Sequence, residues 1–540
     1  MTDVHHGGQR HATATGRDPT LAGIVLILVG YALAAVTGWP QYGRDLLVRA
    51  QATHAVAPAA DTTADHRADH GSGEQPSDNH HAPETHAGSA PPPLTVLPFA
   101  ILLAAIAILP LTPGLSHWWE HNSSKLLVAG LLAAVTLGYY AFVHRQPVDL
   151  HFPAHAVVAP AAAGPSWATA AAVLTNALAA EYVPFIVLLF ALYCVTGGVR
   201  IEGDLAATPT TNAAFIAAGG LAASFIGTTG AAMLLIRPLL ETNRERRLVA
   251  HTVVFFIFVV CNCGGLLLPI GDPPLFLGYL EGVDFLWTLS LWKPWLLTNG
   301  ILVAVYWAWD TFVAHPREQA RDIIRDERLA GPLRIAGLWP NALLMAGVIA
   351  AVALLDPSKA LPGSDWHPWI FLREAVLLAL VGCSLFFGNP ETRRHNGFTY
   401  GAILEVAALF LGIFICMQPA LGLLHEHGAS LGIDSPRAFF WATGFLSSVL
   451  DNAPTYLVFF KAAGIDPRDG LQGTEAARLA AVSLGAVFLG AMTYIGNGPN
   501  FMVKAIAEQS GVKMPSFFGY VLYSVGVLLP VFFVVSLLFL

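Results

Sequence analysis

The stretch LPIGDPPLF, Leu268 to Phe276, decides how the rest of the chain is interpreted. It follows an apolar run, Val253–Val260, and then places an aspartate and two prolines inside a segment with the composition of a membrane helix. Proline donates no backbone hydrogen bond, and the residue before it leaves the helical region. A carboxylate in hydrocarbon is also costly. The stretch therefore predicts a helix that is broken inside a membrane, with Asp272 facing protein or water.

The composition is that of a membrane protein. The chain has 540 residues, of which 55% are hydrophobic and 12% charged, with a net charge of -8. Soluble proteins average about 25% charged residues. Apolar runs of about 20 residues, long enough to cross a bilayer as helices, recur along the chain. We expect an all-α polytopic protein whose main partner is the lipid bilayer. The charge gives no nucleic-acid signal.

About eleven transmembrane helices and two re-entrant hairpins are predicted. The hairpins are Asn212–Leu240 and Arg437–Ala463, each too short for two full crossings. Irregular backbone at membrane depth is tolerated where it is buried in protein or lines a cavity. The expected spans are Leu21–Gly38, Leu94–Leu111, Leu126–Val143, Trp167–Gly198, Val249–Glu281 (interrupted at Gly271–Pro274), Phe285–Val313, Leu338–Leu355, Trp369–Phe387, Gly401–Leu424, Arg478–Ala507 (interrupted at Gly496–Pro499) and Phe517–Leu540.

Arginine-rich loops set the expected orientation. The loops 241–248, 314–334 and 388–398 carry three, five and two arginines, and the positive-inside rule makes all three loops cytoplasmic. If 212–240 is a hairpin and not a full crossing, all three loops lie on the same side of the membrane. The N-terminus is then cytoplasmic and the C-terminus external, and we expect a bacterial inner (plasma) membrane. The chain divides into a tail (1–20), a first helix (21–38), an external loop (39–93), additional helices (94–166), a first repeat (167–313), a cytoplasmic loop with linking helices (314–400) and a second repeat (401–540).

The external loop is rich in histidine and acidic residues. It lacks the apolar residues needed to pack, so it is predicted to be disordered. Imidazoles and carboxylates can bind a transition metal weakly, and a solvated loop without metal is the alternative. The weak metal-ligand candidates are His54, His66, His70, His80, His81 and His86.

An internal duplication is the most informative pattern. Glu181 aligns with Glu405 at an offset of 224, and the same offset places Ser224 on Ser448. When the offset is increased by one residue, to 225, the break at Asp272 aligns with the segment IGNGPN at 495–500. Five predicted crossings separate the copies, so the second copy is inverted. Paired breaks in inverted halves indicate a transporter's binding site near the midplane of the membrane.

These motifs resemble the ion transporter superfamily, which includes citrate transporter-like proteins, NhaD-type sodium/proton antiporters and the ArsB-related arsenite pumps. The segment SSVLDNAPT (447–455) is similar to the hairpin tip of NhaD- and ArsB-type proteins, and the GTTG segment (227–230) occupies the first tip without the family's usual Asn or Asp. The resemblance implies that four breaks meet around substrate and ion. It also implies a possible homodimer.

The candidate ion- or substrate-binding residues lie at these four breaks. Asp451 and Asp272 are expected to hold a cation or protons, although each also suits the cap of the helix that follows. The remaining candidates are Asn452, Asn497, Asn500, Thr228, Thr229, Thr455, Gly227, Gly271 and Gly496.

Secondary active transport is the expected function. No GxxxxGK[ST] phosphate loop is present, and we expect neither enzymatic activity nor a bound cofactor. Sodium/proton antiport is preferred because no basic side chain is found at a tip, with sodium ion and protons as the transported ions. Ion-coupled transport of a carboxylate such as citrate, or of another small anion, is the alternative.

Overall fold

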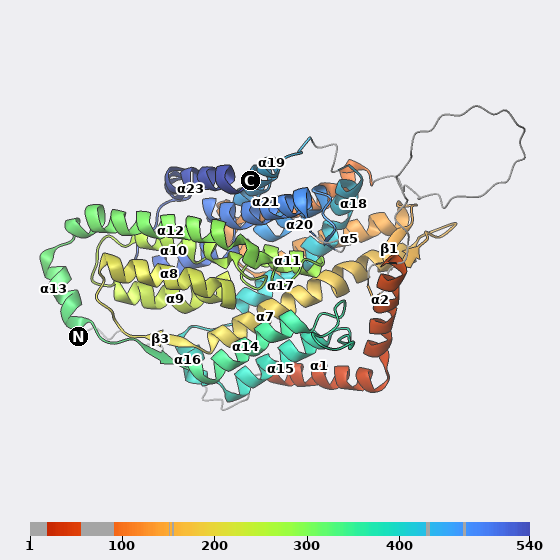
Figure 1. Ribbon diagram of the computed structural model, residues 1–540, viewed down its shortest axis with the longest axis horizontal. Coiled ribbons are helices and arrows are strands. Elements are labelled where there is room, and N and C mark those ends of the chain that lie inside the picture. The colour runs from red at the N-terminus through yellow and green to blue at the C-terminus, as the bar shows by residue number, and fades with distance from the viewer. Residues whose placement is uncertain (1–18, 56–90, 151, 154–155, 428–431, 468–470) are drawn as a thin grey trace, which may run out of the picture.

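Helices make up nearly all of the regular secondary structure (Figure 1). The computed structural model describes residues 19–55, 91–150, 152–153, 156–427, 432–467 and 471–540. Strands β1 (Val148–Leu150) and β2 (Ala156–Val158) pair antiparallel, as do β3 (Arg200–Glu202) and β4 (Arg334–Ala336). These short ribbons connect helices and form no layer of their own, which agrees with the expected all-α class.

The helices pack in two groups. One group, here called the hairpin bundle, contains α8 (Pro209–Ile226), α9 (Thr228–Thr242), α10 (Ala250–Val259), α11 (Pro273–Leu280), α12 (Trp292–Trp309), α19 (Pro436–Val449), α20 (Asn452–Ala462), α21 (Gly473–Leu489), α22 (Gly498–Gln509) and α23 (Phe517–Phe539).

The other group, the flanking bundle, contains α1 (Pro19–Val36), α2 (Trp39–Ala55), α3 (Leu97–Ile108), α4 (Ser116–Trp119), α5 (Asn122–Phe142), α6 (Trp167–Thr175), α7 (Val183–Gly197), α14 (Leu338–Leu354), α15 (Leu372–Phe387), α16 (Pro390–His395), α17 (Gly401–Cys416) and α18 (Gln418–His427). Helix α13 (Ala320–Leu329) lies on the connection between the bundles at one end of the molecule (Figure 1).

Five helices in the described residues are long and apolar enough to cross a membrane, or up to seven if each of two bent pairs counts as one span. The bent pairs are α1 with α2 (67°) and α17 with α18 (44°). The five are Asn122–Phe142, Trp167–Gly197, Trp287–Arg317, Gly473–Met492 and Phe517–Phe539. The protein is thus an integral membrane protein. The predicted number of about eleven crossings is larger than this count, because it includes shorter apolar helices and the two broken helices.

Two helical hairpins form where the sequence predicts them. Helices α8 and α9 pack against each other and are joined at Gly227, whose φ of 78° favours glycine. Helices α19 and α20 also pack together, and are joined at Leu450 and Asp451. All four helices are shorter than the roughly 20 residues that a perpendicular crossing needs.

Both predicted broken helices are present, and the first break is longer than expected. Helix α10 ends at Val259, a 3-10 turn follows at Cys263–Leu266 (η4), and α11 begins at Pro273. The second break lies between the 3-10 turn Gly490–Met492 (η10) and α22. Every side chain from Val253 to Val260 is 0% exposed, because α10 is apolar on all sides and lies inside the hairpin bundle.

The expectation of a disordered loop over 39–93 is wrong for its first part. Residues Trp39–Ala55 form helix α2, which turns sharply from α1. This segment differs from the rest of the loop, because it contains Trp39, Leu46, Leu47 and Val48, whereas the acidic and histidine-rich composition lies mainly after it. Of the weak metal candidates, only the backbone of His54 is described. The other five, His66, His70, His80, His81 and His86, lie outside the described residues.

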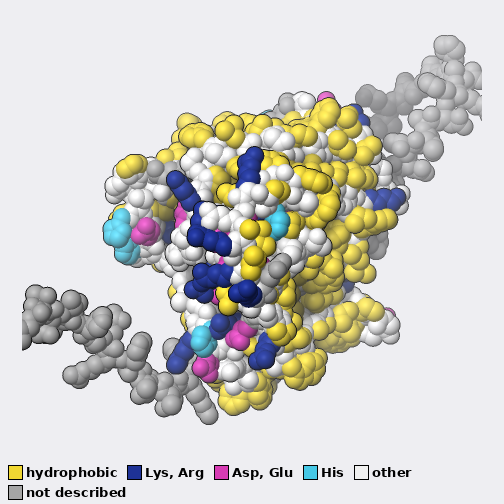
Figure 2. Space-filling model, turned by 90° about the vertical axis from the view of Figure 1, so that its left-hand side faces the viewer, with side chains coloured by type: hydrophobic (Ala, Val, Ile, Leu, Met, Phe, Trp, Pro, Cys, Tyr) yellow, Lys and Arg dark blue, Asp and Glu magenta, His cyan; other side chains and the backbone are white. Residues whose placement is uncertain are grey.

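Basic side chains gather at the end of the molecule that carries α13 (Figure 2). The exposed arginines of the loops 241–248, 314–334 and 388–398 are Arg244, Arg247, Arg317, Arg321, Arg325, Arg328, Arg334 and Arg394. The loops are held together there: the two amide hydrogens of Arg247 and Leu248 donate to the Glu318 carboxylate, and Asn396 donates to the carbonyls of Gly197 and Val199. The arginine-rich loops therefore share one end, as the charge pattern predicts.

Candidate functional site

Asp272 is the centre of a buried polar cluster. Its side chain is 1% exposed. Thr228 Oγ1 donates to Oδ1 at 2.8 Å, Asn452 Nδ2 donates to Oδ2 at 2.7 Å, and Asn497 Nδ2 donates to Oδ1 at 3.2 Å. These three donors come from the first hairpin tip, the second hairpin tip and the second helix break. The four interruptions of the chain thus meet at one carboxylate.

Backbone contact between glycines shapes the first break. A Cβ atom on Gly271 would lie 2.9 Å from the carbonyl carbon of Gly265 and 3.0 Å from the carbonyl oxygen of Leu268. The Gly271 carbonyl accepts a hydrogen bond from the Thr228 amide at 2.8 Å. Prolines at 273 and 274 then start α11. This tight loop fixes Asp272 against the tip of the first hairpin.

The second break repeats this design. A Cβ atom on Gly496 would lie 2.6 Å from the Gly490 carbonyl oxygen and 2.8 Å from that of Ser447. Asn497 occupies the position before α22 that Asp272 occupies before α11. These two residues are mates in the duplication, 225 positions apart, and their side chains contact each other.

Asp451 has a different role from Asp272 although both precede a helix. The Asp451 carboxylate accepts a hydrogen bond from the Ala453 amide at 3.1 Å and so caps α20. Asp272 makes no side-chain cap, and its carboxylate is held by the polar cluster instead. Asp451 still lies near enough for its charge to act on Asp272. The capping interpretation thus describes Asp451 and not Asp272.

The other predicted residues lie around this cluster. Thr455 donates to the Asp451 carbonyl, as a threonine commonly does inside a helix. Thr229 is half-buried beside Thr228, on the first turn of α9. Asn500 donates to the carbonyls of Gly490 and Thr493 and so braces the second break.

Asn262 belongs to the site although it is not among the predicted binding residues. It is 0% exposed and donates to Asn500 Oδ1 at 2.7 Å, and its own Oδ1 accepts from Asn497 at 3.3 Å. It therefore ties the two breaks together. The available signal was an amide side chain in an otherwise apolar run ten residues before Asp272.

Four helices begin at this cluster. Helix α9 starts at Thr228, α11 at Pro273, α20 at Asn452 and α22 at Gly498. Helix N-termini carry a positive partial charge and favour anions. Among the described residues, no Lys or Arg side chain hydrogen-bonds to Asp272 or to its three donors. The cluster thus combines one carboxylate, neutral amide and hydroxyl donors, and converging helix starts.

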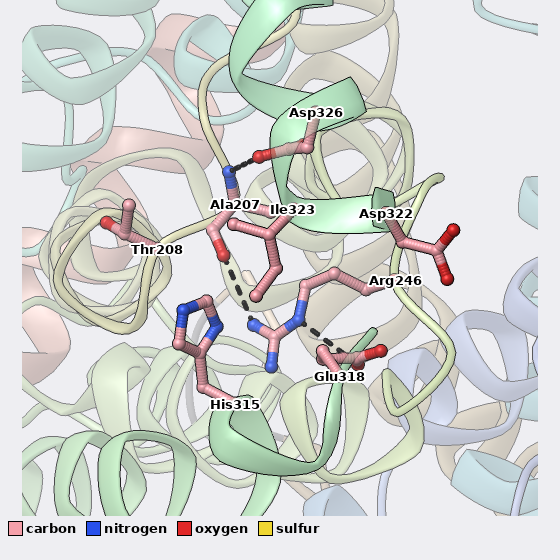
Figure 3. Close-up of a pocket in the computed structure, with 8 residues that line it drawn as sticks. All are labelled: Ala207, Thr208, Arg246, His315, Glu318, Asp322, Ile323 and Asp326. Carbon is pink, nitrogen blue, oxygen red and sulfur yellow. Dashed lines mark hydrogen bonds and ion pairs between the residues drawn. The ribbon is translucent and has the colours of Figure 1, made fainter. Parts of the chain in front are cut away.

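A separate cavity of about 40 Å³ lies under α13 at the basic end (Figure 3). Arg246 extends along it, pairs with Asp310 and approaches Glu318 at 3.6 Å, while Asp326 accepts from the Ala207 amide. His315 lies opposite the Arg246 guanidinium in the same view. These contacts fasten α13 to the base of the first hairpin.

The family follows from a comparison of the sequence. The protein family described as "Putative citrate transport" matches residues 88–540. The chain belongs to this family. The match covers both hairpins and both breaks, so the cluster around Asp272 lies within the family region. Comparison with the curated proteins finds no match. The protein is therefore a membrane transporter of the citrate-transport type, within the ion transporter superfamily.

Proposed function

We propose that this protein is a secondary active transporter that moves citrate or a similar carboxylate together with a cation, at the cluster around Asp272. The observation that carries the proposal is the convergence of four helix starts on this cluster. Free amides and the positive ends of the helix dipoles suit an anion that has several carboxylates. The family match supports a substrate of the citrate type.

The need for a cation follows from charge. Citrate is multiply negative, and the ionisable groups at the cluster are the acids Asp272 and Asp451, with no basic side chain hydrogen-bonded to Asp272 among the described residues. An uncompensated buried charge is costly. Asn452 Oδ1 is buried and accepts no hydrogen bond from the described residues, which leaves an oxygen ligand beside Asp272. Hard cations bind such oxygens.

The transport cycle moves the hairpin bundle relative to the flanking bundle. In this proposal the membrane contains about eleven crossings, with α8–α9 and α19–α20 as re-entrant hairpins in inverted repeats. The arginine-rich end is cytoplasmic in a bacterial inner membrane, and the C-terminus is external. Because the four breaks belong to the hairpin bundle, the bound anion and cation travel with it.

Flux in proteoliposomes tests the function. Radiolabelled citrate is expected to accumulate when a sodium or proton gradient is imposed, and not without one. Asp272→Asn keeps the shape of the side chain and removes its charge, so we expect at least a tenfold loss of uptake, about 1.4 kcal/mol. Asp284→Asn is the matched control, because Asp284 is exposed and pairs with Lys359. Absence of labelled citrate from the wild-type vesicles would overturn the proposal.

Sodium/proton antiport is the second candidate. It is favoured by the buried Asp272 carboxylate, whose donors are all neutral. Sodium-driven proton movement that needs no organic anion and that disappears in Asp272→Asn would support it over citrate transport. Citrate uptake with no such exchange supports the first function.

A further inference from the structure

A second polar cluster lies where the two bundles meet, outside the Asp272 site. Glu181 of the flanking bundle carries a carboxylate oxygen, Oε2, that is buried and has no hydrogen-bond partner among the described residues. Its other oxygen, Oε1, accepts from Gln418 Nε2 at 3.4 Å. On the side of the hairpin bundle, Lys461 pairs with Glu281. The charges of Glu281 and Lys461 both act on Glu181.

Each partner in this cluster is positioned by a short helix that starts at the Asp272 site. Helix α11 begins at Pro273, directly after Asp272, and α20 begins at Asn452. Helix α11 ends directly before Glu281, and Lys461 lies in the last turn of α20. At a rise of 1.5 Å per residue, the eight residues of α11 place Glu281 about 12 Å from the start of the helix at the Asp272 site. The helices are in close contact: a Cβ atom on Gly278 would lie 3.0 Å from Tyr456 Cζ. They therefore move as one unit with the site.

Local geometry also sets Glu181 apart. It lies in a π-helical turn, Asn176–Tyr182 (η3), which precedes α7 and contacts α11. Single π turns within helices occur frequently at functional sites. Its mate in the duplication, Glu405, lies in a regular helix and pairs with Lys125 at 2.7 Å. The two copies thus differ, because only Glu405 has a cation of its own bundle as its direct partner.

We propose that Glu181 is a proton-binding residue of the transport cycle, a role that rests on the proposed function. In the present arrangement Glu181 holds a proton, because Lys461 is engaged by Glu281. When the hairpin bundle moves, Lys461 is carried to Glu181. The Glu181 O–H bond then breaks, and the proton passes to water that enters between the two bundles. The Glu181 carboxylate then pairs with Lys461. Lys461 keeps its own proton throughout.

Other charged groups around Glu181 are accounted for. Helix α17 contributes Glu405, which is paired with Lys125, α11 contributes Glu281 and α20 contributes Lys461. Helices α6 and α7 carry no acidic or basic side chain. On α18, Gln418 is neutral, and the ionisable residues His425, Glu426 and His427 lie in the last turn of the helix, at the end opposite Gln418. Glu281 and Lys461 are therefore the charges that change their relation to Glu181 when the bundles move.

The test measures protons and substrate together. Wild type, Glu181→Gln and the matched control Glu405→Gln are placed in proteoliposomes with a trapped pH dye, and uptake of labelled citrate is followed. We expect Glu181→Gln to carry one proton fewer per citrate and to lose the pH dependence of uptake, while citrate counterflow continues. Glu405→Gln is expected to keep the wild-type proton ratio. An unchanged proton ratio and pH profile in Glu181→Gln would overturn the role.

Two further outcomes separate the hypotheses. Wild-type vesicles that exchange no citrate overturn the proposed function, whereas citrate transport without proton movement overturns only the role of Glu181. If Glu181→Gln does not reach the membrane, Glu181→Asp replaces it, because it keeps an acid with a shorter reach to Lys461. That variant is expected to keep the proton ratio and to shift the pH midpoint of uptake. An unshifted midpoint contradicts the proposal.

Discussion

At the scale of residues, two aspartates with the same local position do different work. Asp451 and Asp272 both precede a helix, so the sequence alone favours a binding role for each and also allows each to cap the helix that follows. The structure separates them because Asp451 reaches the Ala453 amide, whereas α11 begins with two prolines and offers Asp272 no amide there. The three side chains that donate to Asp272, Thr228, Asn452 and Asn497, come from distant segments of the chain. The sequence shows that polar residues stand at the breaks, but it does not show which of them contact one another.

The two threonines of the first tip provide a test at this scale. Thr228→Val removes the hydroxyl that donates to Asp272 at 2.8 Å and keeps the shape of the side chain. A hydrogen bond to a charged group contributes about 1.5–3 kcal/mol, so we expect citrate uptake to fall about tenfold or more. Thr229→Val is the matched control and is expected to change uptake less than about threefold, because the Thr229 hydroxyl makes no hydrogen bond to Asp272 in the described structure. Equal losses in the two variants would contradict the assignment of Thr228.

At the scale of elements, pairs of packed helices lie where the two hairpins are predicted, and both predicted breaks are present. Proline and glycine mark both breaks, and the tips fall at Gly227 and Asp451 because these residues suit a turn and a cap. The length of the first break was missed. The run after Val259 is apolar and looks helical, yet Asn262 leaves the helical region, and Gly264 packs against Gly220 of helix α8. Tertiary contacts decide that conformation.

Glycine substitutions test the role of the first break. Gly271→Ala places a Cβ atom 2.9 Å from the Gly265 carbonyl carbon, and that atom is backbone and cannot turn aside. Overpacking of this kind typically costs about 1–3 kcal/mol, so we expect a lower thermal unfolding midpoint and loss of uptake. Gly300→Ala, in α12 with no atom within 4 Å of its Cβ position, is the control. It is expected to be neutral or slightly stabilising, and the same loss in both variants would contradict the packing argument.

At the scale of the whole molecule, the hairpin bundle carries an ion pair at its contact with the flanking bundle, and the sequence does not reveal that pairing. Lys461 and Glu281 are 180 positions apart, and each looks like an ordinary charge at the end of an apolar run. A cluster of acidic side chains lies on the connection between the bundles at the basic end. Carboxylate oxygens of Asp204, Glu245 and Asp326 lie within 4.8 Å of one another, on the linker before α8, the loop after α9 and helix α13. Such proximity between like charges opposes the docking of α13.

The pH dependence of stability follows from this acidic cluster. Burial, together with the charges of Glu245 and Asp326, raises the pKa of Asp204 above its ordinary value in the folded protein. The folded state then binds the proton more tightly than the unfolded state, so its stability is full below the unfolded pKa, about 4, and falls as pH rises toward the folded pKa. Asp204→Asn never ionises and can donate to a neighbouring carboxylate. We expect it to have the higher thermal midpoint at neutral pH and to lose that advantage in acid.

Thermal unfolding of detergent-solubilised protein across a pH series measures this difference. Asp322→Asn is the matched control on α13, because Asp322 pairs with Arg247 and Arg321 and is expected to lose slightly in stability when neutralised. The opposite signs of the two substitutions are the decisive result. If Asp204→Asn is the less stable protein at neutral pH, the Asp204 charge is favourable in the folded state, and attraction to a cation such as Arg244 outweighs the repulsion between the acids.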